Sequence, residues 1–294
     1  MKKEHLKGNL YLLAAALIWG IAFVAQTEGM KYVGPFTMQA TRFTLAGALM
    51  VPVILIGKRK PSPSDLPFGK VLLGGALCGV CLWIASTLQQ HGLLYTTVGK
   101  SGFITALYIV LVPLMGIFLH KRVGVQVWLA VAIAVVGLYY LCMTDMSAIN
   151  FGDILTLACA LFFSLQILCV DKVGCYVDGI WLSCIQSFTC AIISFVAMFL
   201  FETPSMKDIL QAWLPICYAG LLSGGVAYCF QILGQRSTAP TIASLLMSLE
   251  AVFAAIAGWL LIGQTLSRGE LLGCLLMFVA IILAQIPIQF KKRA

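Results

Sequence analysis

The chain carries the stretch GNLYLLAAALIWG at residues 8–20, and a related stretch, GDILTLACALFFS, follows at residues 152–164. The two align without a gap at an offset of 144 residues. The same offset aligns further residues of the two segments: Ala14 with Ala158, Trp19 with Phe163, Tyr32 with Tyr176 and Arg42 with Gln186. These matches indicate that the second half of the chain repeats the first.

Two later segments extend the repeat at nearly the same spacing. Gly75-x-x-x-Gly79 matches Gly220-x-x-x-Gly224 at an offset of 145, and 127–141 follows the pattern of 270–284 at 143. Glycines four residues apart let helices approach closely in lipid, so we interpret both pairs as packing sites. The sequence therefore predicts a first repeat over residues 1–146 and a second over residues 147–294.

The composition excludes a soluble protein. Hydrophobic residues make up 61% of the 294 residues and charged residues only 10%, against about 25% in a typical soluble domain. The net charge of +8 does not predict nucleic-acid binding, because the basic residues form short clusters between apolar runs. Most of the eleven cysteines lie in these runs and are expected to pack as small apolar residues.

Apolar runs of about 20 residues are long enough to cross a bilayer as helices. We predict an all-α integral membrane protein with ten transmembrane helices, at residues 9–27, 36–57, 69–94, 101–119, 125–143, 152–170, 179–201, 211–233, 240–261 and 268–288.

The distribution of Lys and Arg predicts the orientation, because cytoplasmic loops carry more of both. With the N-terminus inside, fourteen basic residues lie on the cytoplasmic side and four, Lys31, Lys100, Lys207 and Arg268, lie outside. We therefore predict a multi-pass protein of the cytoplasmic membrane with both termini in the cytoplasm.

Five helices per repeat is an odd number, so the second repeat must enter the membrane in the opposite orientation. The loop charges agree, since Lys121 and Arg122 fall inside while Arg268 of the equivalent loop falls outside. Two inverted five-helix repeats around a central cavity are typical of secondary transporters. A duplication without a transport role is the alternative.

At this point the chain resembles the EamA-type members of the drug/metabolite transporter superfamily, over nearly its whole length. The matching stretches are Ala14-x-x-x-x-Trp19-Gly20, Arg42-Phe43, Tyr95-Thr96-Thr97-Val98, Leu111-Val112-Pro113-Leu114 and Leu249-Glu250-Ala251-Val252, with Gly137 and Gly273 in the fifth helices. The chain departs from the family pattern at Ala251, where a proline is frequent. The resemblance implies ten helices around a cavity and transport of amino acids, nucleotide-like metabolites, sugars or drugs.

Arg42 and Glu250 are the ionisable residues that fall deep within predicted spans, where a charge is costly. Three roles are open for Glu250: binding a cationic or amino-bearing substrate, coupling to a proton, or a structural role that includes pairing with Arg42. Arg42 is either structural or a clamp for a carboxylate, which guanidinium binds in a bidentate manner.

Other polar and aromatic residues within the spans are candidates for the wall of a ligand pocket, which combines apolar surfaces with a few polar groups. Each is also a candidate for packing or an interhelical hydrogen bond. The substrate-binding set is completed by Trp19, Gln89, Gln90, His91, Tyr108, Gln166, Gln186, Tyr228, Gln231 and Ser248; Gln26 and Trp83 also lie within spans.

No catalytic motif is present in the sequence: it has no Walker A, G-x-S-x-G or H-E-x-x-H pattern. We therefore expect neither an enzyme nor a cofactor or metal. The leading prediction is a secondary transporter that moves a small organic metabolite, such as an amino acid, by alternating access as a monomer or homodimer, with a coupling proton as a further partner. A membrane-embedded sensor or interaction protein with the same fold is the first alternative, and an integral-membrane enzyme acting on lipid is the second.

Overall fold

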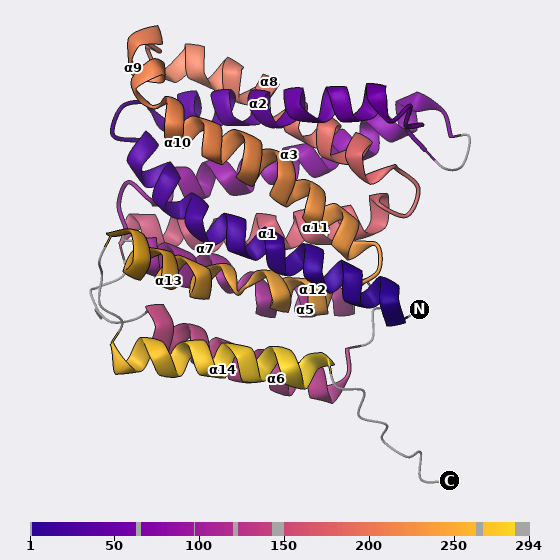
Figure 1. Cartoon of the computed structure of the whole chain (residues 1–294), viewed down its shortest axis with the longest axis vertical. Coiled ribbons are helices and arrows are strands. Elements are labelled where there is room, and N and C mark those ends of the chain that lie inside the picture. The colour runs from indigo at the N-terminus through magenta and orange to yellow at the C-terminus, as the bar shows by residue number, and fades with distance from the viewer. Residues whose placement is uncertain are drawn as a thin grey trace.

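The computed structural model describes residues 2–62, 66–96, 98–119, 123–142, 150–262 and 267–285. Every regular element in these ranges is a helix, which confirms the all-α prediction. The helices lie side by side with their axes roughly parallel, and α6 and α14 form one edge of the array (Figure 1). The start of α1 and the end of α14 lie on the same side of the array, as the predicted orientation requires.

The uninterrupted helices are α1 (Lys2–Gly29), α2 (Pro35–Ile56), α3 (Phe68–Gly92), α6 (Val125–Cys142), α7 (Phe151–Val173), α8 (Gly179–Phe201) and α14 (Arg268–Gln285). Three predicted spans are divided in the structure. One consists of α4 (Val98–Ala106) and α5 (Tyr108–Phe118), and another of α12 (Pro240–Met247) and α13 (Glu250–Ile262). The third runs without a gap through α10 (Trp213–Cys217), the π-helix η1 (Tyr218–Ala227) and α11 (Tyr228–Gln235), and the short α9 (Met206–Gln211) precedes it.

Among the described residues, eight helices are long and apolar enough to cross a membrane. They are Glu4–Gly29, Pro35–Ile56, Phe68–Gly92, Ser101–Phe118, Phe151–Val173, Gly179–Phe201, Trp213–Gln235 and Pro240–Ala257. Two shorter apolar helices, Val125–Tyr140 and Leu271–Ala284, fall in the remaining predicted spans. The chain is thus a multi-pass membrane protein, and the count of ten spans stays a prediction.

The first helix of each half packs against helices of the other half. α1 contacts η1, α11, α12 and α13, whereas α7 contacts α3, α4 and α5. α2 joins the first group through η1, and α8 joins the second group through α3. We call these groups the α1 bundle (α1, α2, α10, η1, α11, α12, α13) and the α7 bundle (α3, α4, α5, α7, α8). The two bundles meet along α2 and α8, and α6 pairs with α14 beside them.

Glycines permit the closest helix contacts, as their spacing indicated. A Cβ atom on Gly220 of η1 would lie 2.9 Å from the Arg42 carbonyl oxygen, and one on Gly79 of α3 would lie 2.9 Å from the Gln186 carbonyl oxygen. Arg42 and Gln186 are the residues aligned at offset 144. Gly79 and Gly220 therefore make equivalent contacts in the two halves. The sequence alignment, which paired Gly79 with Gly224, was wrong by one helical turn.

The ends of α2 and α8 hold each other through acidic side chains. Glu202, which follows α8, accepts hydrogen bonds from the Phe36 and Thr37 backbone N–H groups, each at 2.8 Å, at the start of α2. At the opposite end, Asp178 accepts from the Ile180 backbone N–H at 3.0 Å at the start of α8, and it forms an ion pair at 3.0 Å with Arg59, which follows α2. A carboxylate at a helix N-terminus satisfies unpaired N–H groups and the helix dipole, so the two helices are fixed at both ends.

We predict that Gly220→Ala destabilises the protein by about 1–3 kcal/mol, because the new methyl group overpacks the contact between η1 and α2. The measurement is thermal unfolding in detergent, supported by chemical denaturation. Gly69→Ala is the matched control, since a Cβ atom at Gly69 meets nothing within 4 Å. Equal unfolding midpoints for the two variants would show that the close contact does not matter.

Candidate functional site

Two spans lose the regular α-helical hydrogen bonding for one or two residues near the middle of the molecule, although the backbone there keeps helical dihedral angles. We call these two places breaks, and each leads into a polar residue. α4 ends at Ala106 and α5 begins at Tyr108, while α12 ends at Met247 and α13 begins at Glu250. Directly after α12, the Ser248 hydroxyl donates to the Leu245 carbonyl at 2.8 Å. Such bonds from serine to its own helix compete with backbone pairing and favour a bend. The two breaks present Tyr108 and Glu250 at the starts of the second half-helices.

The Tyr108 hydroxyl donates a hydrogen bond to Glu250 Oε1 at 3.1 Å. Both side chains are buried, at 4% and 6% exposure. The two residues occupy equivalent positions in the two halves. Tyr108 lies as far along the chain from Val98, where α4 starts, as Glu250 lies from Pro240, where α12 starts. This hydrogen bond therefore joins the two broken helices and also links the α7 bundle to the α1 bundle.

Arg42 of α2 is buried close by in the α1 bundle. Its Nη1 donates to Gln26 Oε1 of α1 at 2.5 Å, and its guanidinium carbon lies 4.7 Å from the centre of the Phe43 ring. Its Nε has no hydrogen-bond partner in the described part of the chain. The ion pairs among the described residues lie elsewhere, so the predicted alternative of a direct Arg42–Glu250 pair was wrong.

A cavity with about 40 Å³ of space for water-sized molecules lies between the two bundles, and the Arg42 and Glu250 side chains both line it. Its aromatic wall includes Trp19 and Tyr228, whose ring centres lie 5.0 Å apart. The lining residues of the α1 bundle are Trp19, Phe23, Gln26, Arg42, Ser223, Tyr228, Gln231, Met247 and Glu250; those of the α7 bundle are Gln89, Tyr108, Phe163, Gln166 and Ile167.

Glutamine side chains bridge the bundles across the cavity. Gln231 Nε2 donates to Gln166 Oε1 at 3.0 Å, whereas Gln166 Nε2 makes longer contacts of 3.4 Å to Gln186 Oε1 and 3.5 Å to Gln231 Oε1. Gln89 Nε2 donates to Thr105 Oγ1 at 3.2 Å. An amide has two donors and two acceptor sites, so these side chains keep hydrogen-bonding capacity for a ligand.

The cavity brings together eight of the twelve predicted site residues: Glu250, Arg42, Trp19, Gln89, Tyr108, Gln166, Tyr228 and Gln231. The other four do not line it. Gln186 lies behind Gln166, and Ser248 bonds to its own helix. His91 Nδ1 lies 2.9 Å from the Thr87 carbonyl oxygen, and its ring packs on Phe36. Gln90 is fully buried, and its amide has no hydrogen-bond partner among the described residues.

Six lining residues were outside the predicted set: Phe23, Gln26, Phe163, Ile167, Ser223 and Met247. Two of them carried a signal in the sequence. Phe163 aligns with Trp19 across the repeat, and Gln26 is a polar residue within a span. The other four are apolar or small residues of a kind that fills every helix of this chain, so only the three-dimensional arrangement selects them.

The arrangement can bind a molecule that carries both signs of charge. A buried guanidinium and a buried carboxyl group line one cavity without forming an ion pair with each other, so each keeps hydrogen-bonding capacity for a ligand group of complementary charge. Among the described residues, no group of three His, Cys, Asp or Glu side chains could hold a metal ion.

Comparison with known proteins gives a consistent result. The model of the EamA-like transporter family matches residues 6–143 and 150–285. An uncharacterized transporter of Archaeoglobus fulgidus is 28% identical over 97% of this chain and 88% of its own length. The uncharacterized inner membrane transporter YedA of Escherichia coli K12 is 24% identical, over 92% of this chain and 88% of its own.

The fold also matches a solved structure. A crystal structure of another protein superposes with a TM-score of 0.78 at 19% sequence identity, and the match covers 95% of this chain and 96% of the other. The helical arrangement is thus shared well beyond recognisable sequence similarity.

We predict that Gln26→Leu destabilises the protein by about 1–3 kcal/mol, because it leaves a buried guanidinium N–H of Arg42 without its acceptor. Thermal unfolding in detergent measures the loss. Thr27→Val is the control, since the Thr27 hydroxyl donates within its own helix, to the Phe23 carbonyl at 3.0 Å. A Gln26→Leu protein as stable as this control would contradict the assigned role.

Proposed function

Because the chain belongs to the EamA-like transporter family and is a membrane transporter, we propose that it moves a small organic metabolite, such as an amino acid, by alternating access. The observation that carries the proposal is a cavity between two helix bundles whose wall holds Arg42 and Glu250 without an ion pair between them. We place the protein in the cytoplasmic membrane with both termini in the cytoplasm.

The charges of the cavity favour a zwitterionic substrate. The Arg42 guanidinium is suited to a carboxylate, which it binds with parallel hydrogen bonds. The Glu250 carboxylate is suited to an ammonium group, and Tyr108 holds it in place at 3.1 Å. A ligand with both groups at suitable spacing compensates two buried charges at once, whereas an inorganic ion compensates only one.

The rest of the wall favours an organic substrate. Aromatic rings of Trp19, Phe23, Phe163 and Tyr228 provide apolar surface, and the glutamines provide hydrogen-bonding groups that orient a polar molecule. An apolar or aromatic side chain on the substrate fits this combination.

Alternating access is supported by the position of the cavity. Transporters with inverted repeats bind substrate at the interface of the repeats, at the breaks of discontinuous helices, and open by motion of one bundle against the other. Here the breaks before Tyr108 and Glu250 face each other across that interface. The sequence holds no nucleotide-binding motif, so the proposed energy source is a gradient, with a proton on Glu250 as one form of coupling.

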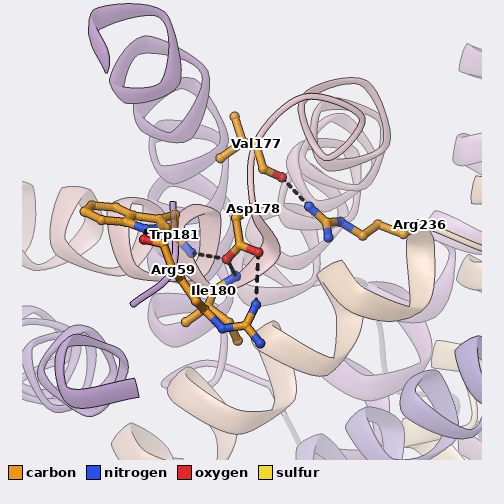
Figure 2. Close-up of polar contacts among 6 residues, drawn as sticks. All are labelled: Arg59, Val177, Asp178, Ile180, Trp181 and Arg236. Carbon is orange, nitrogen blue, oxygen red and sulfur yellow. Dashed lines mark hydrogen bonds and ion pairs between the residues drawn. The ribbon is translucent and has the colours of Figure 1, made fainter. Parts of the chain in front are cut away.

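The bundles are held together most extensively on the side where α1 begins. Arg59 Nη1 forms an ion pair with Asp178 Oδ2 at 3.0 Å, and Arg236 donates to the Val177 carbonyl (Figure 2). The Trp181 indole donates to the Arg59 carbonyl at 2.9 Å. Arg59 follows α2 and Arg236 follows α11, and both helices belong to the α1 bundle. Residues 177–181 run from the connection between α7 and α8 into the start of α8, in the α7 bundle. We call Arg59, residues 177–181 and Arg236 the latch. We propose that the latch closes the cavity on the cytoplasmic side.

The proposal includes the predicted organisation of the chain. Residues 1–146 and 147–294 form two inverted repeats of five helices each, which gives ten spans. The protein acts as a monomer or homodimer, with the substrate, a coupling proton and the lipid bilayer as its partners.

The test is flux of amino acids into proteoliposomes, after a metabolite screen by thermal shift has identified compounds that raise the unfolding temperature. Glu250→Gln is expected to fold but to reduce flux at least about tenfold, equivalent to about 1.4 kcal/mol in the transport barrier. Glu28→Gln is the matched control, because Glu28 is exposed at the end of α1 and pairs with Lys31.

Wild-type flux by Glu250→Gln across a pH series would rule out both the substrate role and the proton-coupling role of this residue. Ligand-dependent stabilisation without flux by the unaltered protein would instead support a membrane-embedded sensor.

We predict that Asp178→Ala opens the cavity from the side on which α1 begins, because it removes the partner of Arg59 and the cap of α8. The readout is labelling of Ser223→Cys, whose side chain lies at the cavity, by a membrane-impermeant maleimide in vesicles of known orientation. Labelling should rise relative to the same protein with Asp178 intact. Lys31→Ala, which removes an exposed ion pair elsewhere, should leave the rate unchanged; an equal rise there would refute the latch.

A further inference from the structure

Three cysteines gather where α3 packs on α7, away from the cavity. Cys78 of α3 is fully buried, whereas Cys81, one turn further along α3, and Cys169 of α7 are partly buried. The sulfur atoms of Cys78 and Cys169 lie 3.2 Å apart. The surroundings of the pair are mainly apolar, with Val71, Val170 and Val173 in the same cluster and Tyr176 packed against it.

The two helices hold the sulfur atoms together from both sides. A Cβ atom at Gly74 would lie 3.0 Å from Val173 Cγ1, and one at Gly92 would lie 3.1 Å from the Gly152 carbonyl oxygen. Cys78 and Cys169 lie between these two close contacts. A disulfide requires a sulfur separation of about 2.05 Å, so the two sulfur atoms, now 3.2 Å apart, have to approach by about 1 Å.

We propose that Cys78 and Cys169 are a redox modification site, at which a peroxide-class oxidant forms a disulfide between α3 and α7. In a reducing cytoplasm both side chains are thiols, which is the state of the structure. The modification covalently links the first half of the sequence to the second, although both helices belong to the α7 bundle.

The chemistry proceeds in two balanced steps. Hydrogen peroxide oxidises the more exposed Cys169 thiol to a sulfenic acid, and the cleaved O–O bond leaves one oxygen on sulfur and releases the other as water. The Cys78 sulfur then attacks the Cys169 sulfur, and the hydroxyl group leaves with the Cys78 proton as a second water. Two electrons pass from the thiols to the peroxide, and a thiol reductant reverses the result.

The location predicts the consequence of the cross-link. Because α3 and α7 are in one bundle, motion of the bundles against each other does not separate the sulfur atoms. The disulfide is therefore expected to raise the unfolding temperature by several degrees, since it constrains the unfolded chain, and to leave flux unchanged. The flux part of this expectation depends on the proposed function; the cross-link itself does not.

The experiment uses the full chain with a protease recognition sequence inserted between residues 146 and 147. The folded protein is treated with hydrogen peroxide, blocked with a maleimide, denatured and then cleaved. On a non-reducing gel the two fragments should stay joined, and dithiothreitol should separate them. Separate fragments after oxidation of the folded protein would overturn the proposal.

Alanine variants identify the bond. Cys169→Ala replaces a partly buried residue and should abolish the cross-link, as should Cys78→Ala. Cys184→Ala, which alters a buried thiol in contact with the Gly47 carbonyl at 3.9 Å, is the matched control and should retain it. A cross-link that persists in Cys78→Ala would assign the chemistry to Cys81 and refute the pair.

Flux measured before and after oxidation tests the predicted consequence. Unchanged flux with a raised unfolding temperature supports the proposal, whereas arrested flux that dithiothreitol restores would show that α3 and α7 move apart during transport. If the reduced protein shows no flux with any substrate, the proposed transport function fails, and the thiol site is then judged by the cross-link and the unfolding temperature alone.

Discussion

The hydrogen bond between Tyr108 and Glu250 is the contact on which the centre of the molecule depends. A carboxyl group in the middle of a membrane protein needs a partner, because lipid and apolar side chains do not solvate it. The partner is the phenol of the equivalent position in the other half, at 3.1 Å. Each residue starts the helix that follows a break. The one hydrogen bond therefore gives the buried carboxyl group a partner and also holds the two breaks opposite each other.

The exchange of α1 and α7 between the halves makes this arrangement possible. α1, with α2, packs against helices of the second half, and α7, with α8, packs against helices of the first half, so each bundle and each wall of the cavity combines both halves. Glycines at positions 79 and 220 let α8 and α2 approach the neighbouring helices closely enough for the bundles to form. The carboxylates of Asp178 and Glu202 then hold α2 and α8 at their ends, where the two bundles meet.

Much of this could be predicted from the sequence, and the failures have identifiable causes. Glu250, Arg42 and six others of the predicted set line the cavity because a polar group within a span needs an enclosed environment. Gln89 lines it and the adjacent Gln90 does not, since one residue turns the side chain by about 100° on a helix. The pairing of Gly79 with Gly224 failed because glycine spacing repeats every turn, and the sequence cannot tell one turn from the next.

The sequence by itself determined the helical membrane architecture and the duplication. Length and polarity of segments are one-dimensional properties, and the bilayer imposes the helix on each apolar run. The tertiary structure alone decided that α1 and α7 change places, that the breaks fall before Tyr108 and Glu250, and that Arg42 bonds to Gln26 rather than to Glu250. Those features depend on which faces of which helices meet, and in a chain that is apolar on almost every face the pattern of residues does not specify them.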